Sequence, residues 1–274
     1  MAIYTKEQQI KKFIEQVKLE LTYKKFLKSD IIYQLINTFN TTNVAIEKQN
    51  YSTEIENPLE MALEFYKEYN MEYYNNIIEN IQSRRIIINK NNNSFTDTEN
   101  NTTNISLCGN DGDLFMIVHE LAHFIDRNST PPIIPDKYWF LSETFAFYVE
   151  KKLENWLLNK DHEDLINTRR NNRMYFENKI VEAIENELYY ENLYRQKGTI
   201  AESDIDIKKI KSIIKYDVPY NIINYLLQYP LANILSGYLI NNYIIQDDNQ
   251  LVEKCINMNL YKILEDFSAS KKTL

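Results

Sequence analysis

The chain has 274 residues, enough for one large domain or two small ones, and 44% of them are hydrophobic, enough to form a core. Its net charge is −8, its pI is about 5.1 and no basic stripe occurs, so the charge argues against a nucleic-acid partner. Four glycines and six prolines are few for the turns of a β-rich protein, so the composition favours helices.

The first part of the chain is expected to be helical. Apolar residues at helical spacing predict a helix over 6–28, and a second helix is expected at about 30–39. The segment Asn57–Glu60 has the capping residue, the proline and the acidic residue that are typical of a helix start. We therefore predict a third helix from there to about residue 83.

Two short strands are expected next. Ile86–Ile88 is a β-branched run, and Ile105–Cys108 predicts a second strand. The Asn-rich stretch 89–103 between them is expected to be a loop or a hairpin tip. These elements predict a small β-hairpin, or part of a short sheet.

The remainder of the chain is predicted to be mainly helical. Helices are expected at about 113–126, 141–158, 173–194, 206–215, 219–245 and 251–267. The polar stretch 159–172 is the best candidate for a loop, and we interpret its pair Arg169-Arg170 as solvated surface charge. The predicted fold class is therefore mainly α, as one domain over 1–274. This domain has two possible lobes, at about 1–158 and about 173–274.

No feature of the sequence predicts a membrane location. Residues 1–13 lack the apolar core of a signal peptide, and no apolar run approaches the ~18 residues of a membrane span. We expect no membrane span and a cytoplasmic protein, and secretion by an unconventional route stays compatible with that. The sequence leaves the oligomeric state open.

The decisive segment is His119-Glu120-Leu121-Ala122-His123, an HExxH motif in the helix predicted at 113–126. Residues four apart share one face of a helix, so both imidazoles can reach one zinc ion. Glu120 lies beside that ion and can take a proton from a water molecule. The motif leaves open another divalent metal in place of zinc.

A catalytic zinc ion normally has three protein ligands, so a third ligand is needed. The metzincin pattern is excluded, because Asp126 and Ser129 stand where it requires glycine and histidine. Asp126 is a candidate partner of an imidazole, and a less suitable candidate ligand. Glu143 follows His123 by 20 residues, at the start of the next predicted helix, and is the expected third ligand. Glu150, two turns further on the same side, is a second candidate at this site.

This pair of segments resembles the gluzincin metallopeptidases. The sequence LSETFAFYVE, residues 141–150, is similar to a segment N-E-G-F-A-x-Y-x-E of the aminopeptidase N family. It also resembles A-E-x-x-S-x-F-x-E of the thimet oligopeptidase and oligoendopeptidase F family, and Glu143 and Glu150 match in both. The resemblance implies one zinc ion held by His119, His123 and Glu143, with Glu150 beside the ligands.

A third segment, residues 219–232, resembles a late motif of the oligopeptidases. In that family, histidine and tyrosine groups of the motif reach the substrate carbonyl opposite the metal. Tyr225 and Tyr229 match in kind, and Tyr220 stands where the family has histidine. The resemblance implies that one of these tyrosines stabilises the oxyanion, and ordinary packing of all three is the alternative. The three segments together extend the resemblance over roughly residues 104–245, and for the first hundred residues we identify no similar family.

The expected activity is zinc-dependent hydrolysis of peptide bonds in a peptide or protein substrate, with Glu120 as the general base. The strand Ile105–Leu107 is expected either to align the substrate through backbone pairing or to be an ordinary paired strand. One alternative is a protein-cleaving effector or toxin with a single target. Another is a non-enzymatic helical binding module with structural zinc, for which Cys108 is a possible fourth ligand.

Overall fold

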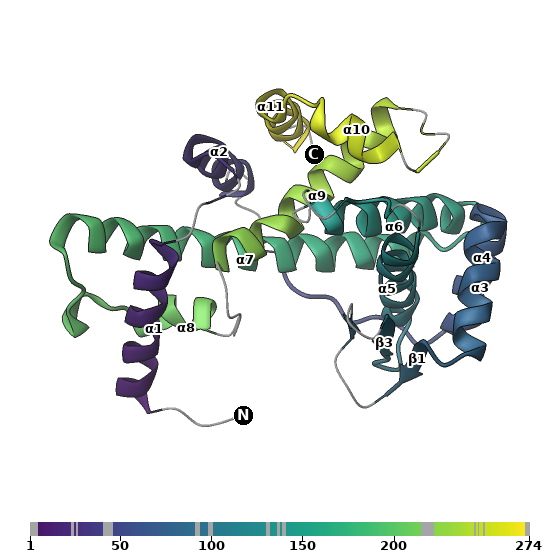
Figure 1. Ribbon diagram of the computed structural model, residues 1–274, viewed down its shortest axis with the longest axis horizontal. Coiled ribbons are helices and arrows are strands. Elements are labelled where there is room, and N and C mark those ends of the chain that lie inside the picture. Colours follow the sequence, from purple (N-terminus) through teal and green to yellow (C-terminus); the bar gives the residue numbers. More distant parts are fainter. Residues whose placement is uncertain are drawn as a thin grey trace. The chain divides into compact units, whose positions relative to one another are not determined.

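The structure is a computed structural model (Figure 1). It describes residues 5–22, 25, 27–40, 46–90, 94–97, 101–129, 132–135, 138, 141–214, 222–243, 245, 247–248 and 250–271. The helices are α1 (Lys6–Glu20), α2 (Ser29–Asn40), α3 (Pro58–Tyr69), α4 (Met71–Gln82), α5 (Gly112–Asn128), α6 (Ser142–Leu158), α7 (Glu163–Lys197), α8 (Ile207–Ile214), α9 (Ile222–Asn242), α10 (Gln250–Ile256) and α11 (Leu260–Lys271), with a short 3-10 turn η2 (Glu202–Asp204). The strands are β1 (Ile86–Asn89), β2 (Phe95–Asp97) and β3 (Thr102–Ser106).

The prediction of a mainly α fold with a short sheet before the helix of the motif is confirmed. Among the described residues, no helix combines the length and the apolar character that a membrane crossing requires.

The helix predicted from Asn57 to about residue 83 is in fact two helices, because Asn70 interrupts it. Asn70 has an extended backbone, and its side-chain oxygen accepts hydrogen bonds from the N–H groups of Glu72 and Tyr73. An asparagine side chain can replace helical backbone partners in this way, so it ends α3 and caps α4. The predicted helix at 251–267 is also divided, into α10 and α11.

The prediction of a loop over 159–172 is wrong, because α7 begins at Glu163. Several polar residues of this stretch pair with partners in the fold. Asn172, for example, accepts a hydrogen bond from Gln49 N–H and donates one to Gln49 O, at 2.7 and 3.0 Å. A polar segment can therefore be a helix when its polar groups have partners in the fold.

The three strands form one mixed sheet in the order β1-β3-β2. β1 and β3 are parallel, with Ile88 opposite Ile105, so these two predicted strands do not form the expected hairpin. The hairpin is made by β2 and β3, which are antiparallel. Because β3 is the central strand, Ile105–Leu107 matches the alternative of an ordinary paired strand, and Leu107 N–H donates to Asn89 O.

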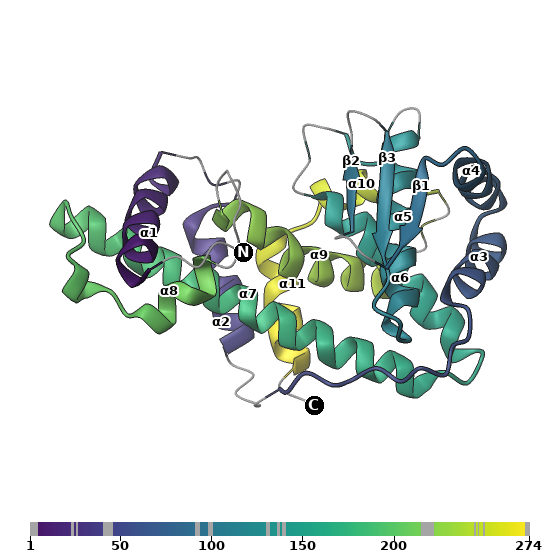
Figure 2. The ribbon, with the colours of Figure 1, turned by 90° about the horizontal axis from the view of Figure 1, so that it is seen from below.

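The turn that joins β3 to α5 is held by the buried side chain of Asp113. Its carboxylate accepts hydrogen bonds from the N–H groups of Cys108 and Gly109, both at 2.7 Å. Gly109 has φ +80°, a conformation that a residue without Cβ adopts without strain. α5 then packs along the sheet (Figure 2), so the sheet orients the helix of the motif.

The chain forms two compact units, and neither is continuous in sequence. Unit 1 contains Met1–Ala45, Tyr175–Leu231 and Asn259–Leu274, and unit 2 contains Ile46–Met174 and Ala232–Met258. The expected lobes at about 1–158 and about 173–274 were continuous. α7 and α9 each contain residues of both units, so the units divide within helices.

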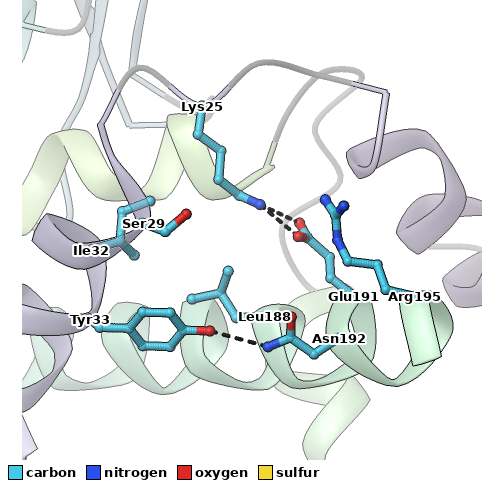
Figure 3. A pocket seen from close by; sticks show the side chains of 8 residues that line it. All are labelled: Lys25, Ser29, Ile32, Tyr33, Leu188, Glu191, Asn192 and Arg195. Atoms are coloured by element: carbon cyan, nitrogen blue, oxygen red, sulfur yellow. Dashed lines mark hydrogen bonds and ion pairs between the residues drawn. The ribbon is translucent and has the colours of Figure 1, made fainter.

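Unit 1 contains an unusual group of buried carboxyl groups on α1 and α7. Glu191 accepts two hydrogen bonds from Lys25, at 2.6 and 2.8 Å, beside a small polar pocket (Figure 3). Glu20 and Glu187 are fully buried. Neither oxygen of Glu187 has a hydrogen-bond partner among the described residues. A buried carboxylate without partners is unfavourable, so this group favours its protonated form.

The pKa values of these groups agree with that conclusion. Burial raises the pKa of Glu20 to about 7, although a hydrogen bond from Ile222 N–H lowers it. Burial raises the pKa of Glu187 well above its usual range, and the charges of Glu20 and Glu191 raise it further. A carboxyl group whose pKa is raised on folding favours the folded state below its unfolded pKa. That contribution is lost as the pH rises through the folded pKa.

We predict that Glu187→Met raises the melting temperature more at pH 8 than at pH 5. Methionine has a similar length but no acid group. A buried acid group without hydrogen-bond partners lowers the free energy of unfolding by roughly 1–3 kcal/mol, and the substitution removes this cost. Thermal unfolding followed by circular dichroism at both pH values measures the effect, with the exposed Glu185→Met on the same helix as control. Equal changes in melting temperature at both pH values would contradict the prediction.

Candidate metal centre

α5 presents its two histidines on the side opposite to its buried residues. The buried residues of this helix are Asp113, Leu114, Phe115, Ile117, Val118, Leu121, Ala122, Phe124, Ile125 and Asp126. His119 and His123 are half-buried, and their Nε2 atoms are 3.1 Å apart. The buried hydroxyl of Tyr66 donates to Val118 O at 2.8 Å and helps to hold the helix against α3.

The first turn of α6 brings Glu143 to the same point. Its Oε2 atom is 3.2 Å from His119 Nε2 and 3.6 Å from His123 Nε2. The three ligand atoms all lie within 4.8 Å of one another. Ligands at 2.0–2.1 Å from a tetrahedral zinc ion are about 3.3–3.4 Å apart. The three separations of 3.1, 3.2 and 3.6 Å therefore fit a single zinc ion.

Glu143 also has an oxygen that needs a partner. Its buried Oε2 accepts no hydrogen bond from any described residue, although it faces two imidazoles. Buried polar atoms normally have partners, so an atom without one requires an explanation. A cation at the meeting point of the three side chains provides that partner.

Glu150 orients one of the imidazoles. It lies on α6, its side chain is fully buried, and its Oε1 atom is 2.7 Å from His119 Nδ1. An ionised carboxylate only accepts hydrogen bonds, so the Nδ1–H group of His119 is the donor. Nε2 is then the nitrogen directed toward His123 and Glu143, and it offers a metal-binding lone pair once its proton has left.

The electrostatics of the group are strongly coupled. Burial lowers the pKa of His119, but its interactions with the carboxylates of Glu143 and Glu150 outweigh it and raise this pKa to about 10. Burial raises the pKa of Glu143, but the two histidines hold it well below its usual range. Without a metal, a proton on His119 therefore supplies the positive charge that the two carboxylates require.

Glu120 adjoins His119 on α5 and is half-buried, as a general base beside the metal needs to be. Asp126 is buried on the same helix. Its buried Oδ1 atom accepts a hydrogen bond from Ile134 N–H at 2.6 Å, so it ties the segment after α5 to this helix. The partner of the His119 Nδ1 atom is Glu150, so only the second imidazole of the motif is left as a partner for Asp126, and that role stays a prediction.

Two of the three tyrosines expected at the site belong to the other unit. Tyr225 and Tyr229 lie on α9 in unit 1, and their hydroxyl groups are 3.1 Å apart. The ring of Tyr229 also packs against Phe176, with centroids 5.9 Å apart. Tyr220 lies outside the described residues. An oxyanion role for any of the three stays a prediction.

The sequence interpretation missed the arginines that surround Glu150. Arg169 Nη2 is 2.7 Å from Glu150 Oε2, and Arg170 Nε is 2.9 Å from Glu154 Oε2. The interpretation as solvated surface charge is therefore wrong for Arg169, whose carboxylate partner is fully buried, whereas the Arg170 side chain is 53% exposed. The sequence does contain a pattern that could have indicated these ion pairs. Two acids on α6, Glu150 and Glu154, are one helical turn apart, and so are two arginines on α7, Arg169 and Arg173.

Comparison with protein-family models, with curated proteins and with solved structures found no match to the chain.

We predict that the protein binds one Zn²⁺ or Co²⁺ ion, and that His123→Ala and Glu143→Ala each abolish stoichiometric binding. Each substitution removes one of the three converging ligand atoms. Isothermal titration of the metal-free protein gives the stoichiometry. His162→Ala is the matched control, because it removes the one histidine outside the motif. Loss of binding in that variant, or full binding in both others, would contradict the assignment.

Proposed function

We propose that the chain is a zinc-dependent peptidase that hydrolyses peptide bonds in a peptide or protein substrate. The observation that carries the proposal is the convergence of His119, His123 and Glu143 on one point. Two histidines and one carboxylate form a three-ligand set that is typical of catalytic zinc, whereas structural zinc sites usually have four ligands. Among the described residues the converging group contains no cysteine, which disfavours the structural-zinc alternative and a role for Cys108.

Zinc, when bound, supplies a Lewis acid that activates water and polarises the scissile carbonyl. The residues of the chain perform the remaining work. Glu120 takes a proton from the attacking water and returns it to the leaving amine. Glu150 holds His119 with Nδ1–H occupied. Tyr225 and Tyr229 are the described candidates for a hydroxyl that stabilises the oxyanion, and Tyr220 is the third candidate.

The resemblance to gluzincins supports this proposal through the two segments that supply the three side chains. In this proposal the mainly helical chain is a small relative of the thimet oligopeptidases and oligoendopeptidases F, with a second zinc segment like that of aminopeptidase N. A cytoplasmic location belongs to the same proposal. A protein-cleaving effector is the alternative with the same chemistry, and only its substrate differs.

We predict that the zinc-loaded protein cleaves members of a mixed peptide library and that Glu120→Gln does not. Loss of a positioned general base lowers the rate roughly 10²–10⁴-fold, while the three metal ligands stay in place. Mass spectrometry of the new termini measures cleavage and the preferred residues, and titration confirms that Glu120→Gln binds zinc. Equal cleavage by both proteins would contradict the role of Glu120. Cleavage of folded proteins only would favour the effector alternative.

We also predict that zinc binding releases at least one proton at pH 6 and strengthens as the pH rises. His119 has a pKa of about 10 in the metal-free protein, so its proton must leave before Nε2 can bind a metal. The affinity then rises about tenfold for each pH unit below that pKa. Calorimetry in buffers with different ionisation enthalpies counts the protons, at a pH below the ~7 at which zinc-bound water ionises. Binding without proton release would contradict the protonation of His119.

A further inference from the structure

Glu150 has more charged partners than one carboxylate needs. Its Oε1 atom accepts the hydrogen bond from His119. Its Oε2 atom accepts hydrogen bonds from Arg169 Nε and Nη2, at 3.0 and 2.7 Å, and another from Arg173 Nη2. Two guanidinium groups therefore share one oxygen of a carboxylate whose side chain is fully buried.

Arg173 is also linked to the imidazole of His119 through a second side chain, Phe147. Its side chain is only 5% exposed, and its guanidinium carbon lies 4.5 Å from the centre of the Phe147 ring. The Phe147 ring in turn packs edge to face against His119, with centroids 5.4 Å apart. Arg173 therefore supports both groups that hold this histidine, the carboxylate of Glu150 and the ring of Phe147.

The arginines determine what Glu150 can do. A buried carboxylate with no cation beside it is strongly unfavourable, and it could take the His119 proton or bind a metal ion itself. The three N–H groups that donate to Oε2 come from two positively charged arginines, so they balance the negative charge of Glu150 and fix the plane of its carboxylate. Oε1 is then left with a single role, which is to accept the hydrogen bond from His119 Nδ1.

We propose that Arg169 and Arg173 are positioning residues of the metal centre. They act through Glu150, and Arg173 also acts through Phe147, to keep His119 Nε2 directed at His123 and Glu143. The inference rests on the proposed metal site but not on the peptidase activity. Arg170 is the matched comparison, because it is adjacent on α7 and carries the same charge, yet its carboxylate partner is Glu154.

The test is the Co²⁺ affinity of the full chain, measured by competition with a chromophoric chelator. We expect Arg169→Met and Arg173→Met to weaken Co²⁺ binding by roughly tenfold or more, the range of substitutions beside metal-ligating histidines. Arg170→Met should bind Co²⁺ like the wild type. Arg173→Lys should recover part of the affinity, because it restores the charge but not the planar guanidinium group that contacts Glu150 and the Phe147 ring. Wild-type affinity in both methionine variants would overturn the proposal.

A double-mutant cycle separates positioning from a general loss of stability. In a Glu150→Gln background, Arg169→Met should change the Co²⁺ affinity much less than in the wild type, because its path to His119 is already removed. The same fold-change in both backgrounds would overturn action through Glu150. If Arg173→Met fails to fold by circular dichroism, Arg169→Met and Arg173→Lys carry the test.

A second readout follows the histidine directly. The chain has three histidines, so ¹⁵N-labelled imidazoles give a simple spectrum in which His119 can be assigned by substitution. In the zinc-loaded wild type we expect a slowly exchanging Nδ1 proton on His119, and rapid exchange of it in Arg169→Met. An unchanged Nδ1 signal would overturn the positioning role. Failure of the wild type to cleave any peptide, with these effects intact, would refute the peptidase proposal alone.

Discussion

The buried carboxylate of Glu150 joins three helices of unit 2. It extends from α6, accepts a hydrogen bond from His119 on α5 and accepts others from Arg169 and Arg173 on α7. On α6 it lies two turns after Glu143, so one face of this helix supplies both a metal-binding oxygen and the group that orients a second ligand. The geometry of the candidate centre therefore depends on the packing of α6 between α5 and α7.

The candidate ligands could be predicted from the sequence because their signals are local. His119 and His123 are one helical turn apart, and Glu143 begins a segment with its own recognisable pattern. The support of these ligands could not be predicted in the same way. Arg173 lies 23 residues after Glu150, and only the return of the chain as α7 brings the two together. The equal spacing of the acids on α6 and the arginines on α7 makes such pairs possible, but the sequence alone does not show that these two helices pack together.

For the fold too, local patterns could be predicted from the sequence and contacts between distant segments could not. Helical periodicity located most helices, because each buries a stripe whose repeat is visible in the sequence. The prediction of a loop over 159–172 was wrong, because its polar residues indicated a loop although several of them have partners in the fold. The prediction that β1 and β3 form an antiparallel hairpin was wrong for a related reason. Strand direction depends on the whole sheet, and the short strand β2 inside the connection changed a hairpin into a mixed sheet.

Stability alone does not explain the charges around Glu150. Replacing a buried group of ion pairs with apolar residues of similar volume is often neutral or stabilising, because charges lose their hydration when they are buried. A fold that needed only to hold α6 against α7 could use leucine at these positions. What apolar contacts cannot do is fix which nitrogen of an imidazole carries the proton. The buried carboxylate does this for His119, and the two arginines allow that carboxylate to remain charged while it does so.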